Sequence, residues 1–141
     1  YTNNYYTSNT VTFAYNNCIT QNNLEIISDK NKIFETLKHI IDNAFKFTNF
    51  GTVTLTCLKN NNHLVFTIAD TGIGIAPEKH ELIFERFMQV EQGLTRKYGG
   101  NGLGLTLANK YIKMLNGSIS IKSDLNKGST FIVKIPVNHE Q

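Results

Sequence analysis

The chain has 141 residues, the length of a single domain, and its 14 basic and 11 acidic residues give a formal net charge of +3. This charge is too small to indicate a nucleic-acid-binding surface, which needs clustered basic side chains. No apolar run approaches the roughly 20 residues of a membrane span, and the N-terminal residues lack the apolar stretch of a secretory signal. Two cysteines, Cys18 and Cys57, are too few for a disulfide framework and indicate free thiols in a reducing compartment.

Residues 1–9 show no hydrophobic period, so we expect a loose lead-in there. One domain is expected over residues 10–138, followed by a tail at 139–141. Alternating side chains predict short strands at residues 11–15 and 24–27.

The next segment predicts one long helix and one β-hairpin. Asp29 has the residue type of an N-cap, and apolar residues then recur at helical spacing as far as Phe47. Two runs that alternate apolar and polar residues, at 53–57 and 64–68, predict the two strands of a hairpin. The second strand ends at Asp70, where a glycine-rich loop begins.

The C-terminal half predicts two more helices and two more strands. The helices are expected at 78–84 and at 102–116, where Asn116-Gly117 ends the second, and a loop at 88–101 separates them. The strands are expected near 119–121 and 131–137. Helices and hairpins alternate in blocks, which indicates an α+β fold. We expect a mixed, mostly antiparallel sheet of about five strands with about three helices on one face.

Polar side chains form a stripe along the first long helix. His39, Asn43 and Lys46 are spaced i, i+4 and i+7 and share one side of the helix, with Glu35 and Asp42 beside them. A solvated face explains such a stripe in most helices. The alternative is a functional site, in which Asn43 offers an amide oxygen to Mg²⁺ and Lys46 offers a cation to a phosphate.

The loop Asp70-Thr71-Gly72-Ile73-Gly74-Ile75 is a second candidate site. Its glycines allow a ligand to approach the backbone closely. The anionic Asp70 can accept hydrogen bonds from an amino group but would repel a phosphate. A plain turn between two elements is the alternative.

A third segment, Gly99-Gly100-Asn101-Gly102-Leu103-Gly104-Leu105, opens the second long helix. Free N–H groups at a helix N-terminus, with its partial positive charge, form an anion-binding site. Neither a dinucleotide-binding fold nor a P-loop fits the segment, because no βαβ unit precedes it and no Gly-Lys-Ser/Thr is present.

These segments occur in order, with Glu85-Arg86-Phe87 between the second and the third. In this combination, down to residues 39–48 and 83–87, the chain resembles the ATP-binding catalytic domain of sensor histidine kinases of two-component systems. That domain belongs to the wider superfamily of type II topoisomerases, heat-shock chaperones and mismatch-repair ATPases. The likeness covers about residues 10–137. It implies a two-layer α/β sandwich of the Bergerat type, with the nucleotide held between helices under a mobile lid.

The resemblance assigns a role to each motif position. Asn43 would coordinate Mg²⁺ and Lys46 would contact phosphate, while Asp70 would accept a hydrogen bond from the adenine amino group. The remaining assignments are Gly72, Ile73 and Gly74 for the shape of the pocket, Phe87 for the lid, Gly100, Asn101, Gly102, Leu103, Gly104 and Leu105 for the phosphates, and Thr130 for a place near adenine.

Two positions between the second and third motifs leave alternatives open, and one position within the third departs from the family's pattern. Arg96 and Lys97 would contact the γ-phosphate or a partner domain, or would lie in a solvated loop. Asn101 stands where the family commonly has Thr or Ser, and we expect this difference to tune the affinity for nucleotide.

The helix stripe also carries the candidate catalytic residues. Hydrolysing relatives place a Glu four residues before the metal-binding Asn, as a base that activates water. Here that position holds His39, and the nearest carboxylates are Asp42 and Glu35. We therefore expect slow or negligible ATP hydrolysis, and we take His39 and Asp42 as the candidate catalytic residues.

The resemblance implies the catalytic half of a histidine kinase, with ATP and Mg²⁺ as cofactors. None of the four histidines has a His-Glu-(Leu/Ile)-Arg-like context, so the phosphoacceptor histidine is expected on a separate dimerisation domain, with a response regulator receiver domain as the next partner. We expect a cytoplasmic monomer without nucleic-acid or membrane contact. The alternatives are a hydrolysing ATPase module of the topoisomerase or chaperone type, a serine kinase of the anti-sigma type, and a degenerate nucleotide-binding module that serves protein interaction.

Overall fold

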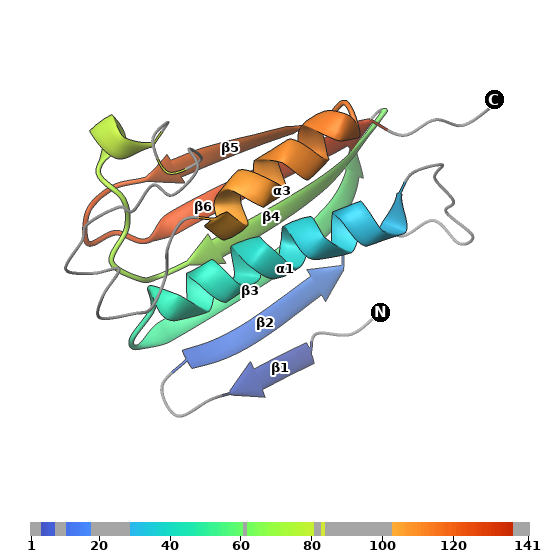
Figure 1. The fold of residues 1–141 in the computed structure, drawn as a ribbon. Coiled ribbons are helices and arrows are strands. Elements are labelled where there is room, and N and C mark those ends of the chain that lie inside the picture. Colours follow the sequence, from blue (N-terminus) through green and yellow to red (C-terminus); the bar gives the residue numbers. More distant parts are fainter. Residues whose placement is uncertain are drawn as a thin grey trace.

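A computed structural model describes residues 4–7, 11–17, 29–60, 62–80, 83 and 103–136. Within these residues, two α-helices lie side by side on one face of a six-stranded sheet (Figure 1). The predicted fold class, a two-layer α+β sandwich with a mixed and mostly antiparallel sheet, is confirmed.

The sheet is antiparallel except for one pair of strands. Its strands, in spatial order, are β1 (Asn4–Thr7), β2 (Val11–Asn17), β3 (Gly51–Asn60), β4 (His63–Asp70), β6 (Ser129–Pro136) and β5 (Ser118–Ser123). Only β2 and β3 run parallel, and helix α1 (Lys30–Lys46) lies between them in the chain. Parallel neighbours need such a crossover, whereas the antiparallel pairs β3–β4 and β5–β6 are joined by short turns.

The N-terminus of α1 is capped as predicted. The Asp29 carboxylate accepts hydrogen bonds from the backbone N–H groups of Asn31 and Lys32, at 3.0 and 3.1 Å. It also pairs with the Lys32 ammonium at 2.8 Å. These bonds satisfy N–H groups that have no partner inside the helix, so the helix begins at a defined residue.

Helix α3 (Leu103–Met114) ends at the predicted Asn-Gly pair. Asn116 takes the left-handed conformation, with φ of 62°. Gly117 donates its N–H to the Ile112 carbonyl at 2.9 Å, and Asn116 donates to the Lys113 carbonyl at 3.0 Å. This Schellman arrangement satisfies the last carbonyls of the helix and turns the chain into β5.

The core fills the space between the helices and the sheet. Alternate residues of β3, β4 and β6 point toward the helices, as the period of two requires. The largest fully buried apolar side chains in the described residues are Ile40, Val53, Ile68, Ile83, Ile112, Val133 and Ile135. None of the helices in the described segments is long and apolar enough to cross a membrane.

Three details differ from the sequence predictions. The sheet has six strands because the expected lead-in contains β1, whose partner is β2. The short helix predicted at 78–84 is a 3₁₀-helix, η1 (Pro77–Lys79), with residues 81, 82 and 84 outside the description. The described residues therefore contain two α-helices and one 3₁₀-helix, where about three helices were expected. The strand at 24–27 and the loop at 88–101 lie outside the described residues, and the domain bounds stay a prediction.

Candidate functional site

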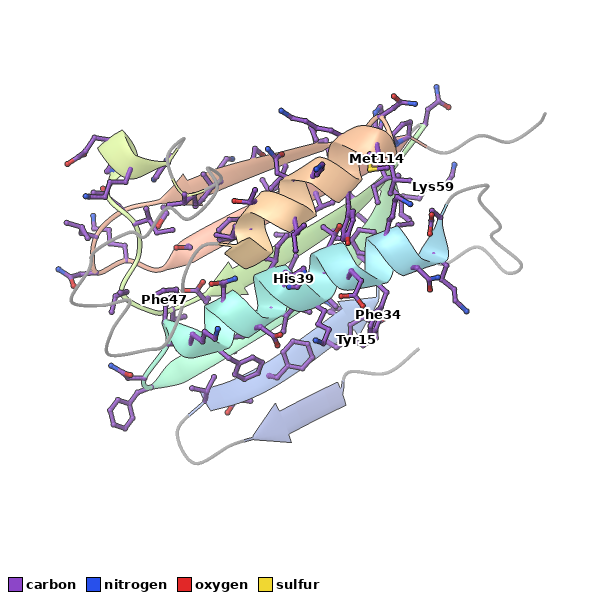
Figure 2. The ribbon with its side chains drawn as sticks, in the orientation of Figure 1. Tyr15, Phe34, His39, Phe47, Lys59 and Met114 are labelled. Carbon is purple, nitrogen blue, oxygen red and sulfur yellow. The ribbon has the colours of Figure 1, made fainter. Side chains whose placement is uncertain are left out.

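A cavity opens between the C-terminal end of α1, the start of α3 and the sheet. Its lining comes from Asn43, Ala44, Phe47, Asp70, Ile73, Gly74, Ile75, Leu105, Ser129 and Phe131. Figure 2 shows Phe47 at the end of α1 that borders the cavity. The lining is mostly apolar, with Asn43, Asp70 and Ser129 as its polar side chains. Small-molecule sites have this composition, in which a few polar groups orient a ligand within apolar walls.

Asp70, the last residue of β4, is the charged group of the cavity. Its side chain is buried, and its Oδ1 accepts the N–H of Gly72 at 2.9 Å. Burial raises the pKa of the Asp70 carboxyl, and backbone hydrogen bonds from Gly72 and Ser129 partly oppose that rise. When ionised, this carboxylate keeps lone pairs for further donors, so the structure places an acceptor at the base of the cavity.

Asn43 lies in the last turns of α1 and lines the cavity, and a hydrogen bond within the helix orients its side-chain amide. Its Nδ2 donates to the His39 carbonyl oxygen, one helical turn back, at 2.8 Å. This bond fixes the assignment of the amide, so Oδ1 is the atom that Asn43 can offer to a ligand. Oxygen is the ligand atom that Mg²⁺ prefers, so Asn43 fits the predicted metal-ligating role.

Close backbone approach holds the loop after Asp70 against α1. The N–H of Ile73 donates to the Phe47 carbonyl at 3.1 Å. A Cβ on Gly72 would overlap that same carbonyl oxygen and lie 2.9 Å from its carbon. Gly72 is therefore required for the loop to reach the end of the helix.

The other side of this loop is held by the end of β5, by the β5–β6 turn and by His80, which follows η1. Asn126 donates its N–H to the Ile73 carbonyl at 2.6 Å, and the N–H of Ile75 donates to Ser123 Oγ at 2.7 Å. His80 Nε2 lies 3.0 Å from the Ile75 carbonyl. Three separate elements thus fix residues 73–75, which line the cavity.

Ser129, and not Thr130, lies at the cavity. Successive side chains of a strand point to opposite faces, and Ser129 shares its face with the buried Phe131. Ser129 pairs with Asp70 across β4 and β6, whereas Thr130 pairs with Ala69 on the opposite face of the sheet. Ser129 therefore takes the cavity-lining position on this strand, and the place near adenine assigned to Thr130 stays a prediction.

Three predicted residues of α1 do not line the cavity. His39 lies about two turns before Phe47 (Figure 2), and its Nε2 is 3.8 Å from Glu35 Oε1. Asp42 is exposed and lies 4.0 Å from the ammonium of Lys38. Lys46 is exposed at the last position of the helix.

The glycine-rich motifs are only partly within the described residues. Ile73, Gly74 and Leu105 line the cavity, and Gly72 lies in the same loop. Leu103 and Gly104 form the first turn of α3. The predicted residues Phe87, Arg96, Lys97, Gly100, Asn101 and Gly102 lie outside the described residues.

Several lining residues were missed by the sequence reasoning. They are Ala44, Phe47, Ser129 and Phe131. Two signals were present in the sequence. Phe47 follows Asn43 by one helical turn, and Ser129 has the parity of the apolar residues of the last strand.

Comparisons with known proteins agree on one family for this chain. A family model described as histidine kinase-, DNA gyrase B- and HSP90-like ATPase matches residues 28–139. The autoinducer 2 sensor kinase/phosphatase LuxQ of Vibrio parahaemolyticus is 39% identical over 125 residues, covering 84% of this chain and 15% of LuxQ. The sensor protein SrrB of Staphylococcus aureus is 41% identical over 109 residues, covering 77% of this chain and 19% of SrrB. The chain thus spans less than a fifth of the length of these relatives.

Solved structures show the same fold. Full-length ShkA, crystallised in complex with AMPPNP, superposes with a TM-score of 0.77 at 28% identity, over 90% of this chain and 26% of ShkA. The nucleotide-free catalytic domain of histidine kinase ThkA superposes with a TM-score of 0.75 at 25% identity, over 90% of this chain and 79% of that domain.

Proposed function

Since the chain belongs to the family of histidine kinase-, DNA gyrase B- and HSP90-like ATPases, we propose that its cavity binds Mg-ATP for transfer of the γ-phosphate to a histidine. Its homologues and structural neighbours make it an ATP-binding catalytic domain of the two-component sensor kinase type. The juxtaposition of Asn43 and Asp70 in one cavity carries the proposal, because they suit the two ends of this nucleotide.

The adenine ring would occupy the apolar part of the cavity. Asp70 would accept a hydrogen bond from the exocyclic amino group, and Ser129 faces Asp70 across the neighbouring strands. Ile73, Ile75 and Leu105 would contact the ring faces. Burial of the carboxylate favours this arrangement, since a hydrogen bond to a charged acceptor gains strength away from water.

The phosphates would lie toward Asn43. Its amide oxygen would be the protein ligand of Mg²⁺, which neutralises phosphate charge when it is bound. Lys46, one turn further along α1, would supply a cation near the phosphates. The glycine-rich start of α3, with Gly104, Leu105 and the residues before them, would supply backbone N–H groups.

The α1 stripe determines the fate of the γ-phosphate in this proposal. We keep His39 and Asp42 as candidate catalytic residues, His39 because it occupies the position at which hydrolysing relatives carry a base. Asp42 is engaged by Lys38 at the solvent-exposed side of the helix. Neither Asp42 nor Glu35 lines the cavity, so activation of water by these carboxylates would be weak and transfer to a histidine would be favoured over hydrolysis.

The acceptor in this proposal is a histidine on a separate dimerisation domain of a longer cytoplasmic sensor protein. A response regulator receiver domain would take the phosphoryl group next. Phosphoryl transfer requires mainly positioning and charge neutralisation, so one domain can supply ATP while another supplies the nucleophile.

A transfer assay tests this function. The chain is mixed with γ-³²P-labelled ATP, Mg²⁺ and a phosphoacceptor domain from a sensor histidine kinase. We expect acid-labile label on the acceptor, loss of label with Asp70→Asn, and no change with Thr130→Ala, which alters the opposite face of the sheet. Rapid release of labelled phosphate without an acceptor would instead identify a hydrolysing ATPase.

A further inference from the structure

The hydroxyl of Ser123 joins three groups beside the cavity. It accepts the N–H of Ile75 at 2.7 Å and donates to the carbonyl oxygen of Gly128 at 2.8 Å. It also lies 2.7 Å from the hydroxyl oxygen of Ser129. Ser123 is the last residue of β5 and is absent from the cavity lining, whereas Ile75 and Ser129 belong to it.

The number of protons in this cluster fixes the direction of each bond. A serine hydroxyl has one hydrogen to donate, and a carbonyl oxygen can only accept. The hydrogen of Ser123 therefore goes to Gly128, and the hydrogen of the bond between the two serines comes from Ser129. Ser129 is left with lone pairs alone for anything bound in the cavity.

Two acceptors consequently face the ligand side by side. Asp70 and Ser129 are direct partners in the β4–β6 register, and both line the cavity. The amino group at C6 of adenine has two hydrogens, one for each acceptor. A purine with an oxygen at C6 has none there, and its carbonyl would face two acceptors.

We propose that Ser123 is a positioning residue that holds Ser129 as an acceptor and thereby sets the preference of the cavity for 6-amino over 6-oxo purine nucleotides. The proposal rests on the proposed function, because it assumes that the cavity binds the base. Without the Ser123 hydroxyl, Ser129 could rotate and donate to a 6-oxo group.

The test compares the affinities for ATP and ITP, two nucleotides that differ at C6. Titration calorimetry is carried out on the unaltered chain and on Ser123→Ala, Ser123→Thr and Ser120→Ala. We expect the ATP-over-ITP ratio to fall by about tenfold in Ser123→Ala, the size of one hydrogen bond in a buried site. Ser123→Thr keeps the hydroxyl and should keep the ratio. Ser120→Ala, an exposed position on the same strand, is the matched control.

The ratio separates this role from a structural one. If Ser123 only supports the backbone at Ile75, Ser123→Ala weakens both nucleotides equally, and an unchanged ratio would overturn the proposal. If Ser123→Ala does not fold, Ser129→Ala takes its place and must lower the ratio, and an unchanged ratio there is equally contrary. Failure of the unaltered chain to bind ATP would overturn the proposed function, and this inference with it.

Discussion

The contact between Gly72 and the end of α1 can be tested by one methyl group. Gly72 does not have a positive φ, so alanine can adopt its backbone conformation, and the penalty of Gly72→Ala comes from overlap alone. The new Cβ would lie 2.9 Å from the Phe47 carbonyl carbon, against an ordinary contact of 3.4–4 Å, and would overlap the carbonyl oxygen. The loop must move away, which breaks the 3.1 Å bond from Ile73 to Phe47.

The magnitude follows from these two losses. A lost hydrogen bond costs about 1 kcal/mol and overpacking about 1–3 kcal/mol, so Gly72→Ala should lower the free energy of unfolding by about 2–4 kcal/mol. At about 3 °C for each kcal/mol, the melting temperature falls by about 6–12 °C. Affinity for ATP should also fall by about tenfold or more, because the Gly72 N–H that holds Asp70 moves with the loop.

Thermal unfolding followed by circular dichroism measures the first effect, and calorimetry well below both melting temperatures measures the second. Gly117→Ala is the matched control, since its Cβ would also overlap a backbone carbonyl oxygen, that of Lys134. Gly117 does not line the cavity, so this control should lose stability and keep its affinity. A Gly72→Ala variant with unchanged melting temperature and affinity would refute the argument.

The contacts of Asp70, Ser129 and Asp29 can each be tested in solution. Burial raises the pKa of Asp70, so ATP affinity measured by calorimetry should decrease as the pH falls through that raised value, at a higher pH than for an exposed carboxyl; an Asp70→Asn variant should lack this dependence. The free energy of unfolding should depend on pH in the opposite direction. The contribution of Asp70 to stability is present below the ordinary carboxyl pKa and is lost as the pH rises through the raised pKa. Ser129→Ala should weaken ATP binding by about fivefold to tenfold in the same assay, whereas Thr130→Ala should leave it unchanged, and the opposite order would contradict the assignment of faces. Asp29→Ala should lower the melting temperature at neutral pH; since the Lys32 pair lowers the pKa of Asp29, the difference should disappear as the pH falls through that lowered pKa.

Local patterns account for the parts of the fold that the sequence predicted well. The cap at Asp29 and the left-handed turn at Asn116 depend on bonds within a few residues, so residue type and spacing were sufficient. β1 was missed because its short segment has no alternation of apolar and polar residues, and its position depends on pairing with β2.

The sequence predicted those parts of the candidate site in which the type of a single residue indicates its chemistry. Asp70 and Asn43 were found from residue type, spacing and the family likeness, and the cavity contains both. The prediction named Thr130 instead of Ser129 because the face of a strand follows from its register with β4, which the order of residues in the chain does not specify. The contact from Ser123 to Ile75 joins residues 48 positions apart, so no local pattern indicates it.

ATP binding by the cavity that contains Asp70 and Asn43 is the central claim to test. The measurement is titration calorimetry of ATP, with and without Mg²⁺, on the unaltered chain, Asp70→Asn, Asn43→Ala and the control Thr130→Ala. We predict that Asp70→Asn reduces affinity by about tenfold to a hundredfold, the worth of hydrogen bonds to a charged group, and that Asn43→Ala removes the Mg²⁺ dependence while ATP still binds. Equal affinities in the unaltered chain and Asp70→Asn would contradict the account, because adenine would then lie elsewhere.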